Sequence, residues 1–163
     1  MQITEIYRSI QGESSFAGLP CIFVRLTGCN LRCTWCDSEY TFEGGRRMTL
    51  DEVEAQVWAL APVKRVEITG GEPMLQEKEA LELMGRLLAS GFTILLETSG
   101  ERPLARVPRE VVKVVDVKCP HSGEAGTFLV ENLSTLTARD EMKFVLSDRT
   151  DYEFAREIGR AHV

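Results

Sequence analysis

Three of the five cysteines in this 163-residue chain, Cys29, Cys33 and Cys36, fall within one run of eight residues. Three thiolates in one loop can bind three corners of a cubane iron–sulfur cluster and leave the fourth iron open to an external ligand. A structural zinc ion is the alternative, but it needs a fourth protein ligand. The candidates for that ligand are Cys21, Cys119 and His121. Clustered cysteines in a chain with no expected export signal indicate a metal or redox site rather than a disulfide framework.

The cysteine run must be held by regular structure, and the chain predicts strands and helices in alternation around it. Thr49 and Glu52 are spaced as a capping box at the start of the first helix. Strands that alternate with helices indicate parallel βα units with the helices outside the sheet. We expect strands at 2–10 (a sheet edge), 20–27, 65–69, 92–97, 111–117 and 141–146, and helices at 49–60, 76–89, more weakly near 129–136, and from about 150.

Polar segments follow the predicted strands directly. The cysteine run follows strand 20–27, the sequence GGEP at 70–73 follows the next strand, and ETSG at 97–100 and Lys118 come at the ends of the two after that. Functional residues in such folds gather at the carboxyl ends of the strands. Glycine lets a backbone approach a ligand closely, which suits the GGEP segment. We therefore expect one site that combines these segments.

Composition excludes several classes of function. Apolar and charged residues make up 44% and 27% of the chain, as in an ordinary globular protein. The net charge of -6 argues against a nucleic-acid-binding protein, which would carry a basic face. No apolar run approaches the length of a membrane span, and residues 1–13 lack the pattern of a secretory signal. We expect a cytoplasmic protein.

The C-x3-C-x2-C spacing, with Trp35 before the last cysteine, resembles the radical S-adenosylmethionine (SAM) superfamily. The sequence ITGGEP at 68–73 is similar to the second signature of that superfamily. The resemblance implies an incomplete parallel β/α barrel, a [4Fe–4S] cluster on Cys29, Cys33 and Cys36, and SAM on the open iron. It also implies that reductive cleavage of SAM gives a carbon radical that takes hydrogen from the substrate. No protein side chain is then needed as a catalytic acid or base.

Three further segments, 7–13 (YRSIQGE), 23–29 (FVRLTGC) and 36–38 (CDS), together resemble the 7-carboxy-7-deazaguanine synthases of this superfamily. The resemblance implies a lyase that converts 6-carboxy-5,6,7,8-tetrahydropterin to 7-carboxy-7-deazaguanine, with ring contraction and loss of ammonia. This reaction belongs to the biosynthesis of 7-deazapurines such as queuosine, a tRNA modification. The resemblance also implies a flavodoxin- or ferredoxin-type reductant and, for the full-length protein, a homodimer.

On the substrate side, the resemblance implies that Arg25 holds the substrate carboxylate, a role that suits a planar bidentate donor. A surface ion pair is the alternative for Arg25. Thr69 would also touch the substrate. The pterin pocket would be lined by Ile10, Gln11, Gly12 and Glu13.

On the cofactor side, the resemblance implies that Glu97 contacts the ribose hydroxyls of SAM. Lys118 would face SAM or the open site, although the sequence DVK at 116–118 departs from one family pattern, Ser-Pro-Lys. Thr98 and Ser99 are expected to be turn residues. The remaining SAM contacts are expected from Trp35, Cys36, Asp37, Gly71 and Glu72.

Ser38 resembles the hydroxyl ligand that this family offers to Mg²⁺. Such a hard ion keeps most of its waters, so one or two protein oxygens and the substrate carboxylate would suffice. A simple loop cap is the alternative for Ser38, and Asp37 either caps the loop or supports the ion. Cys21 and Cys119 are interpreted as core residues, and His121 as a loop histidine that usually binds nothing.

The last six residues, IGRAHV at 158–163, are encoded, with a following stop codon, by a widely used sequencing adapter. We therefore expect residues 1–157 to form a radical SAM core domain that is C-terminally incomplete, followed by a non-native tail at 158–163. A missing terminal strand would leave an open sheet edge.

Two other functions are compatible with the cysteine run. A glycyl-radical enzyme activase would share the run but should lack the Gln11-Gly12-Glu13 element and a need for Mg²⁺. A non-catalytic zinc-binding module would contain zinc without iron or sulfide.

Overall fold

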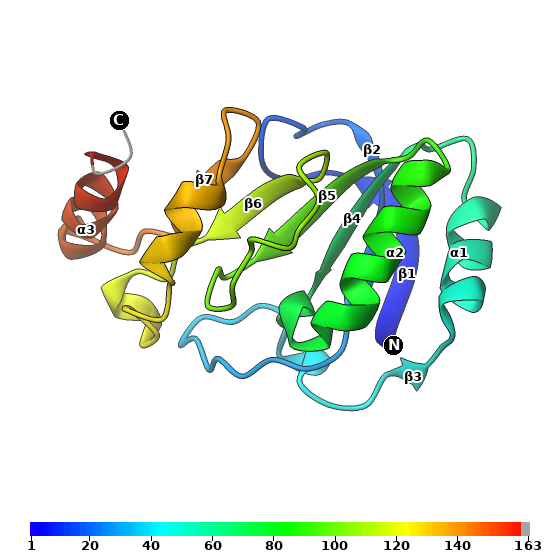
Figure 1. Ribbon diagram of the computed structural model, residues 1–163. Coiled ribbons are helices and arrows are strands. Elements are labelled where there is room, and N and C mark those ends of the chain that lie inside the picture. Colours follow the sequence, from blue (N-terminus) through cyan, green and yellow to red (C-terminus); the bar gives the residue numbers. More distant parts are fainter. Residues whose placement is uncertain (161–163) are drawn as a thin grey trace.

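A mixed sheet of seven strands forms the centre of the molecule (Figure 1). The computed structural model describes residues 1–160. The strand order is β3-β1-β2-β4-β5-β6-β7. The strands from β2 to β7 run parallel, whereas β1 pairs antiparallel with β2 and with β3. The strands are β1 (Gln2–Ile10), β2 (Pro20–Leu26), β3 (Arg46–Arg47), β4 (Arg65–Gly70), β5 (Thr93–Thr98), β6 (Val112–Asp116) and β7 (Glu141–Lys143). Within residues 1–160 the first and last strands of this order do not pair, so the sheet stays open and the expected incomplete barrel is confirmed.

Helices α1 (Leu50–Ala59) and α2 (Glu77–Ala89) cover one face of the sheet, and α3 (Arg149–Arg160) lies beyond β7 (Figure 1). The capping box that starts α1 is confirmed, because the Glu52 amide donates to Thr49 Oγ1 and the Thr49 amide donates to Glu52 Oε2. No helix among residues 1–160 is both long enough and apolar enough to cross a bilayer. The described part of the chain also contains four short 3₁₀ helices: η1 (Glu39–Thr41), η2 (Pro73–Gln76), η3 (Pro120–Ser122) and η4 (Val130–Thr135).

The two faces of the sheet differ in chemistry because side chains alternate along each strand. Ile22, Val24 and Leu26 of β2 are fully buried on the face that α1 and α2 cover. The intervening positions on β2 and β4 include Arg25 and Thr69, which are register partners on the opposite face. The parallel strands therefore carry an apolar core on one side and a row of polar side chains on the other.

Several expected elements differ in extent. Strand β3 pairs with β1, so β1 is not the edge strand. The strand expected at 141–146 ends at Lys143, because its ladder partner β6 ends at Asp116, the residue paired with Lys143. The helical stretch expected near 129–136 is the 3₁₀ helix η4. Helix α3 includes residues 158–160 of the expected non-native tail, and residues 161–163 of that tail lie outside the described residues.

A buried ion pair sets the start of β7. Lys113 Nζ lies 3.1 Å from Asp140 Oδ2, and both side chains are almost fully buried. Asp140 also accepts hydrogen bonds from the Lys113 amide at 2.7 Å and the Thr137 amide at 2.8 Å. Burial alone would raise the pKa of Asp140, but these hydrogen bonds and the Lys113 ammonium outweigh it and lower the pKa. The Asp140 carboxylate thus fixes the turn that leads into β7.

We expect Asp140→Ala to lower the free energy of unfolding by about 3–5 kcal/mol, because it leaves the Lys113 ammonium buried without a counter-charge. Lys113→Met should cost less, because the Asp140 carboxylate keeps its backbone hydrogen bonds. Urea unfolding of both variants, followed by tryptophan fluorescence, measures the two losses. A loss for Lys113→Met equal to that for Asp140→Ala would contradict this account.

Candidate functional site

The three clustered cysteines line one cavity of about 470 Å³ on the polar face of the sheet. Cys29, Cys33 and Cys36 are free and partly exposed. Their loop follows β2 and passes along the carboxyl ends of the parallel strands (Figure 1). Burial raises the pKa of the Cys29 and Cys33 thiols, so metal binding must release protons from them.

The three thiols are spaced more widely than the ligands of a single zinc ion. Among residues 1–160, one set of three metal-binding side chains has all its ligand atoms within 4.8 Å of one another. That set does not include these cysteines. A zinc–sulfur distance of about 2.3 Å would bring tetrahedral thiolates to about 3.8 Å from one another. The candidates for a fourth zinc ligand, Cys21, Cys119 and His121, do not line the cavity. Cys21 and Cys119 are buried, as expected of core residues.

The segment that follows β6 forms hydrogen bonds with the cysteine loop. Thr34 donates from its amide to the Ser122 carbonyl oxygen at 2.9 Å and from its hydroxyl to the His121 carbonyl oxygen at 2.7 Å. The Arg32 amide donates to Glu124 Oε1. These contacts cross about 90 residues of sequence, so the loop geometry depends on the folded sheet.

Glycine is required where the GGEP turn meets the cysteine loop. A Cβ atom on Gly71 would lie 2.2 Å from the Gly28 carbonyl oxygen and 2.7 Å from Cys29 Cβ. The Glu72 amide donates to the same Gly28 oxygen at 2.8 Å. The backbone of the turn therefore packs directly against the start of the cysteine loop.

The Glu72 carboxylate joins the ends of β4 and β5. It is 1% exposed and accepts hydrogen bonds from the Met74 amide, the Thr98 hydroxyl, and the amide and hydroxyl of Ser99. Burial raises the pKa of Glu72, and these four donors counteract that effect. Thr98 and Ser99 therefore do more than turn the chain, because they fix the GGEP carboxylate.

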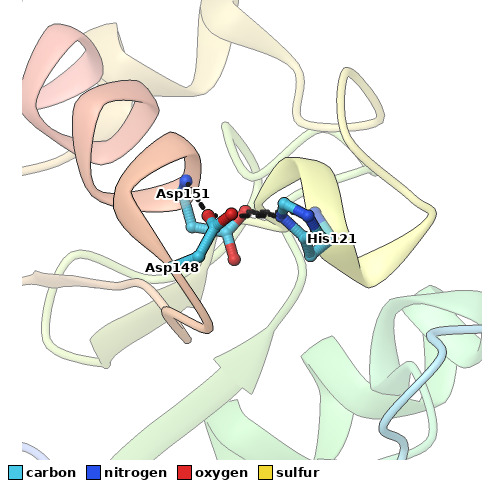
Figure 2. Close-up of side chains that lie close together, drawn as sticks. All are labelled: His121, Asp148 and Asp151. Atoms are coloured by element: carbon cyan, nitrogen blue, oxygen red, sulfur yellow. Dashed lines mark hydrogen bonds and ion pairs between the residues drawn. The ribbon is translucent and has the colours of Figure 1, made fainter.

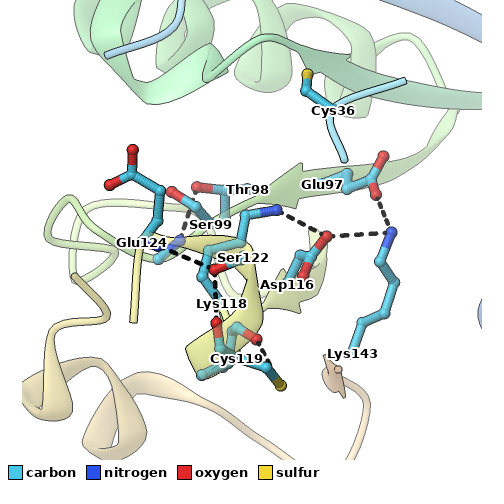
Figure 3. Close-up of polar contacts among 12 residues, drawn as sticks. Cys36, Glu97, Thr98, Ser99, Asp116, Lys118, Cys119, Ser122, Glu124 and Lys143 are labelled. Atoms are coloured by element: carbon cyan, nitrogen blue, oxygen red, sulfur yellow. Dashed lines mark hydrogen bonds and ion pairs between the residues drawn. The ribbon is translucent and has the colours of Figure 1, made fainter. Parts of the chain in front are cut away.

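Figure 3 shows a chain of ion pairs across the ends of β5, β6 and β7. Lys143 Nζ lies 2.8 Å from Glu97 Oε1, 3.3 Å from Asp116 Oδ2 and 2.6 Å from Glu13 Oε2. Lys118 Nζ lies 3.0 Å from Asp116 Oδ2. The second oxygen of Asp116, Oδ1, is buried and has no hydrogen-bond partner among residues 1–160. Two lysines thus balance three carboxylates around the cavity.

The charges in this network stabilise one another. Burial alone would raise the pKa of Glu97, but the Lys143 ammonium outweighs it and the pKa is lowered. Burial would lower the pKa of Lys143 and of Lys118, but Glu97 and Asp116 respectively outweigh it and both values are raised. Glu97 and both lysines are therefore ionised at neutral pH.

Sequence comparison places this architecture in a known family. Residues 23–120 match the family described as the radical SAM superfamily. A protein of Koribacter versatilis called 7-carboxy-7-deazaguanine synthase is 70% identical over 162 residues, which cover 99% of this chain and 72% of that protein. The chain belongs to the 7-carboxy-7-deazaguanine synthase family. A synthase of the same name from Methanospirillum hungatei is 40% identical over 99% of this chain and 68% of its own length.

The fold agrees with a solved structure of the family. The crystal structure of QueE from Escherichia coli matches 98% of this chain and 77% of its own with a TM-score of 0.82, at 26% identity. Family membership means a radical SAM enzyme with a [4Fe–4S] cluster and SAM, and three thiols on one cavity fit that cluster. A glycyl-radical activase and a zinc module are thereby set aside.

Most residues predicted for the substrate side lie on the cavity. Gln11, Gly12, Glu13, Arg25 and Thr69 line it, whereas Ile10 does not and is 65% exposed. Arg25 also forms an ion pair, with Nε 2.9 Å from Glu5 Oε1, and donates to the Tyr7 hydroxyl at 3.2 Å. Its guanidinium is therefore oriented within the cavity wall rather than on the open surface.

The residues predicted for the cofactor and the ion also lie on the cavity. Ser38 occupies the N-cap position of η1 but makes no side-chain cap hydrogen bond, so its hydroxyl is not committed to that helix. Ser38 Oγ lies 3.8 Å from Cys36 Sγ. The other predicted residues that line the cavity are Trp35, Cys36, Asp37, Gly71, Glu72, Glu97 and Lys118.

His121 belongs to a separate cluster with Asp148 and Asp151 (Figure 2). Asp151 accepts from the His121 amide at 3.0 Å and, through its other oxygen, from the amide and hydroxyl of Ser147. Asp148 Oδ1 accepts from the amides of Thr150 and Asp151 at the start of α3. These hydrogen bonds tie η3 to α3, which accounts for the cluster without a metal ion.

Sequence reasoning missed three charged residues of the site, Glu67, Asp116 and Lys143, all of which line the cavity. The two-residue period of the strands could have indicated that these side chains lie on the same face as the site. Glu67 lies two positions before Thr69, Asp116 lies two positions before Lys118, and Lys143 is the register partner of Asp116.

We expect Gly71→Ala to displace the cysteine loop, because its Cβ would overlap the Gly28 backbone and Cys29 Cβ. Iron content after anaerobic reconstitution should fall severalfold. Gly85→Ala is the matched control, because Gly85 lies in α2 with nothing within 4 Å of its Cβ position. The control should bind iron normally and gain about 0.5–1 kcal/mol of stability. Equal iron content in the two variants would contradict the steric account.

We expect Lys143→Met to cost about 1–3 kcal/mol of stability at pH 7, because Glu13 and Glu97 lose their shared counter-charge and Asp116 keeps Lys118 alone. In the wild-type protein the pKa of Glu97 is lowered. The stability that this shift contributes is present above the carboxyl pKa of the unfolded state and is lost as the pH falls through the pKa of the folded state. The difference between wild type and variant should therefore hold from pH 7 to about pH 5 and shrink below the ordinary carboxyl pKa of about 4.3, in urea unfolding at each pH. Lys78→Met, on exposed α2 surface, is the control. A pH-independent difference would show that lost packing, not charge, is the cause.

Proposed function

We propose that this chain converts 6-carboxy-5,6,7,8-tetrahydropterin to 7-carboxy-7-deazaguanine with loss of ammonia; the name of its family gives the product of this reaction. The observation that carries the proposal is one cavity that combines three free thiols with the GGEP turn, Arg25 and the 11–13 segment. When bound, the cluster and SAM supply a carbon radical that takes hydrogen from the substrate. The chain's own residues bind, orient and shield the reactants.

We propose that the substrate lies against residues 11–13, Arg25 and Thr69. The Arg25 guanidinium is pre-oriented by Glu5 and Tyr7, which lowers the entropy cost of gripping a carboxylate. The Thr69 hydroxyl donates a hydrogen bond to Glu97 at 3.0 Å, so Thr69 links the substrate side of the cavity to the cofactor side. Ile10 does not line the cavity, so it would contribute to substrate binding through its backbone.

We propose that SAM lies along the carboxyl ends of β4, β5 and β6. The unpartnered Asp116 Oδ1 is a buried acceptor that a ligand hydroxyl or ammonium donor would satisfy. Lys118, fixed by Asp116, presents an ammonium to the same cavity. Trp35, Asp37, Gly71, Glu72 and Glu97 complete the proposed contacts.

We propose that Mg²⁺ binds between Ser38 and the substrate carboxylate. The Ser38 hydroxyl makes no helix-cap hydrogen bond and lines the cavity, which supports this assignment. Asp37 beside it adds negative charge to the same wall. A hard ion that keeps several waters needs only such a small share of protein ligands.

We further propose that residues 1–157 are one radical SAM core domain. The single sheet supports one domain. A flavodoxin- or ferredoxin-type reductant, a homodimer and a cytoplasmic location complete the proposal. Light scattering of the reconstituted protein tests the dimer.

The deciding experiment is anaerobic reconstitution with iron and sulfide, followed by incubation with SAM, Mg²⁺, a reductant and 6-carboxytetrahydropterin. We expect the carboxydeazaguanine product by chromatography. Ser38→Ala should retain the cluster and lose most of the stimulation by Mg²⁺, whereas Ser134→Ala, on exposed η4, should retain it. SAM cleavage without product would reject the substrate, and equal stimulation in both variants would reject Ser38 as the ion ligand.

A further inference from the structure

A buried carboxyl group, Glu67, lies against the segment proposed to bind the pterin. Glu67 is 5% exposed and lines the cavity from β4, two positions before Thr69. Gln11 donates a hydrogen bond from its side-chain nitrogen Nε2 to Glu67 Oε2. The other end of the same amide, Gln11 Oε1, accepts from the Glu13 amide at 3.1 Å. The Gln11 side chain is therefore held at both ends.

The backbone of Gln11 is also fixed. Its amide donates to the Leu19 carbonyl oxygen at 2.9 Å, and its carbonyl oxygen accepts from the Gly18 amide at 2.8 Å. Gly12 and Glu13 follow the end of β1 and lie outside the strand. The Gln11 side chain holds the Glu13 backbone, and Lys143 pairs with the Glu13 carboxylate. Glu67 of β4 thus orients the side-chain amide of Gln11, and that amide in turn accepts a hydrogen bond from the Glu13 backbone N–H.

We propose that Glu67 is a positioning residue for the pterin substrate, which acts through Gln11 to hold the 11–13 segment in its binding conformation. This inference rests on the proposed function. It adds a residue outside the cysteine run and the GGEP turn, and it makes substrate affinity depend on the protonation of a group that does not itself react.

The charges around Glu67 favour its neutral form. Burial and the nearby Glu97 carboxylate raise the pKa of Glu67 to about 8, and the Gln11 hydrogen bond counteracts them. Glu13 faces it from the loop after β1 and adds to the rise, while Arg25 of β2 opposes it. Cys21 of β2 also faces Glu67, but burial raises the pKa of that thiol to about 12, so it stays protonated.

The sign of the pH effect follows. Below pH 8 the neutral carboxyl accepts from Gln11 without adding charge beside Glu13 and Glu97. Above pH 8 ionisation places a further negative charge among these carboxylates and repels the 11–13 segment and the anionic substrate. Substrate affinity should therefore fall through this range.

The test is equilibrium binding of 6-carboxytetrahydropterin to the reconstituted protein with SAM and Mg²⁺ but without reductant, at pH 7 and near pH 9. Glu67→Gln keeps an acceptor for Gln11 and cannot ionise, so its Kd should equal that of wild type at pH 7 and stay unchanged at high pH. Wild type should weaken about fivefold or more over the same range, since most of Glu67 is ionised one pH unit above its pKa. Glu67→Leu should weaken binding about tenfold at both pH values, because the Gln11 amide loses its partner.

Glu79→Gln, on the exposed side of α2, removes one charge away from the cavity and should follow wild type. Iron content and SAM cleavage should be equal in all variants. Wild-type affinity for Glu67→Leu, or a parallel pH dependence in wild type and Glu67→Gln, would overturn the inference; the second comparison holds even if Glu67→Leu does not fold. Failure of wild type to bind the pterin while it still cleaves SAM would reject the proposed substrate, and this inference with it.

Discussion

The contact between Gly71 and the Gly28–Cys29 backbone is the constraint on which the site depends. Two strand ends meet there with no side chain between them, so the GGEP turn and the cysteine loop share one position in space. Glu72 extends the contact to β5, because its buried carboxylate accepts from Thr98 and Ser99. Three neighbouring strand ends are thereby fixed by backbone atoms and one carboxylate, which is stiffer than a set of long side chains.

The charged side of the cavity is built on a different principle. Glu13, Glu97 and Asp116 come from three separate segments and would repel one another if Lys143 were absent. Lys143 Nζ reaches all three carboxylates, and its placement depends on the turn that Asp140 fixes at the start of β7. A buried ion pair on the apolar face thus positions a charge on the polar face, so stability and the candidate site are coupled through one short strand.

The sequence was a good guide where the signal was local. Cysteine spacing and the GGEP turn depend on residues a few positions apart, and the capping box of Thr49 and Glu52 spans three residues. The alternation of strands and helices follows from periodicity and predicted the parallel sheet. The ends of the strands were predicted less accurately. Strand β7 ends at Lys143, where its partner β6 also ends, although the apolar run in the sequence continues to Leu146.

The sequence by itself therefore determined the thiols, the glycine turn, the order of the elements and the family. The tertiary structure decided which polar side chains meet. Glu67 and Gln11 are 56 residues apart, and Lys143 and Glu13 are 130 apart. Thr98 and Ser99 were expected to be turn residues, yet they bind Glu72, which lies 26 and 27 residues away. Such contacts arise from strand register, which places every second residue of adjacent strands on one face, and no local pattern records which strands become neighbours.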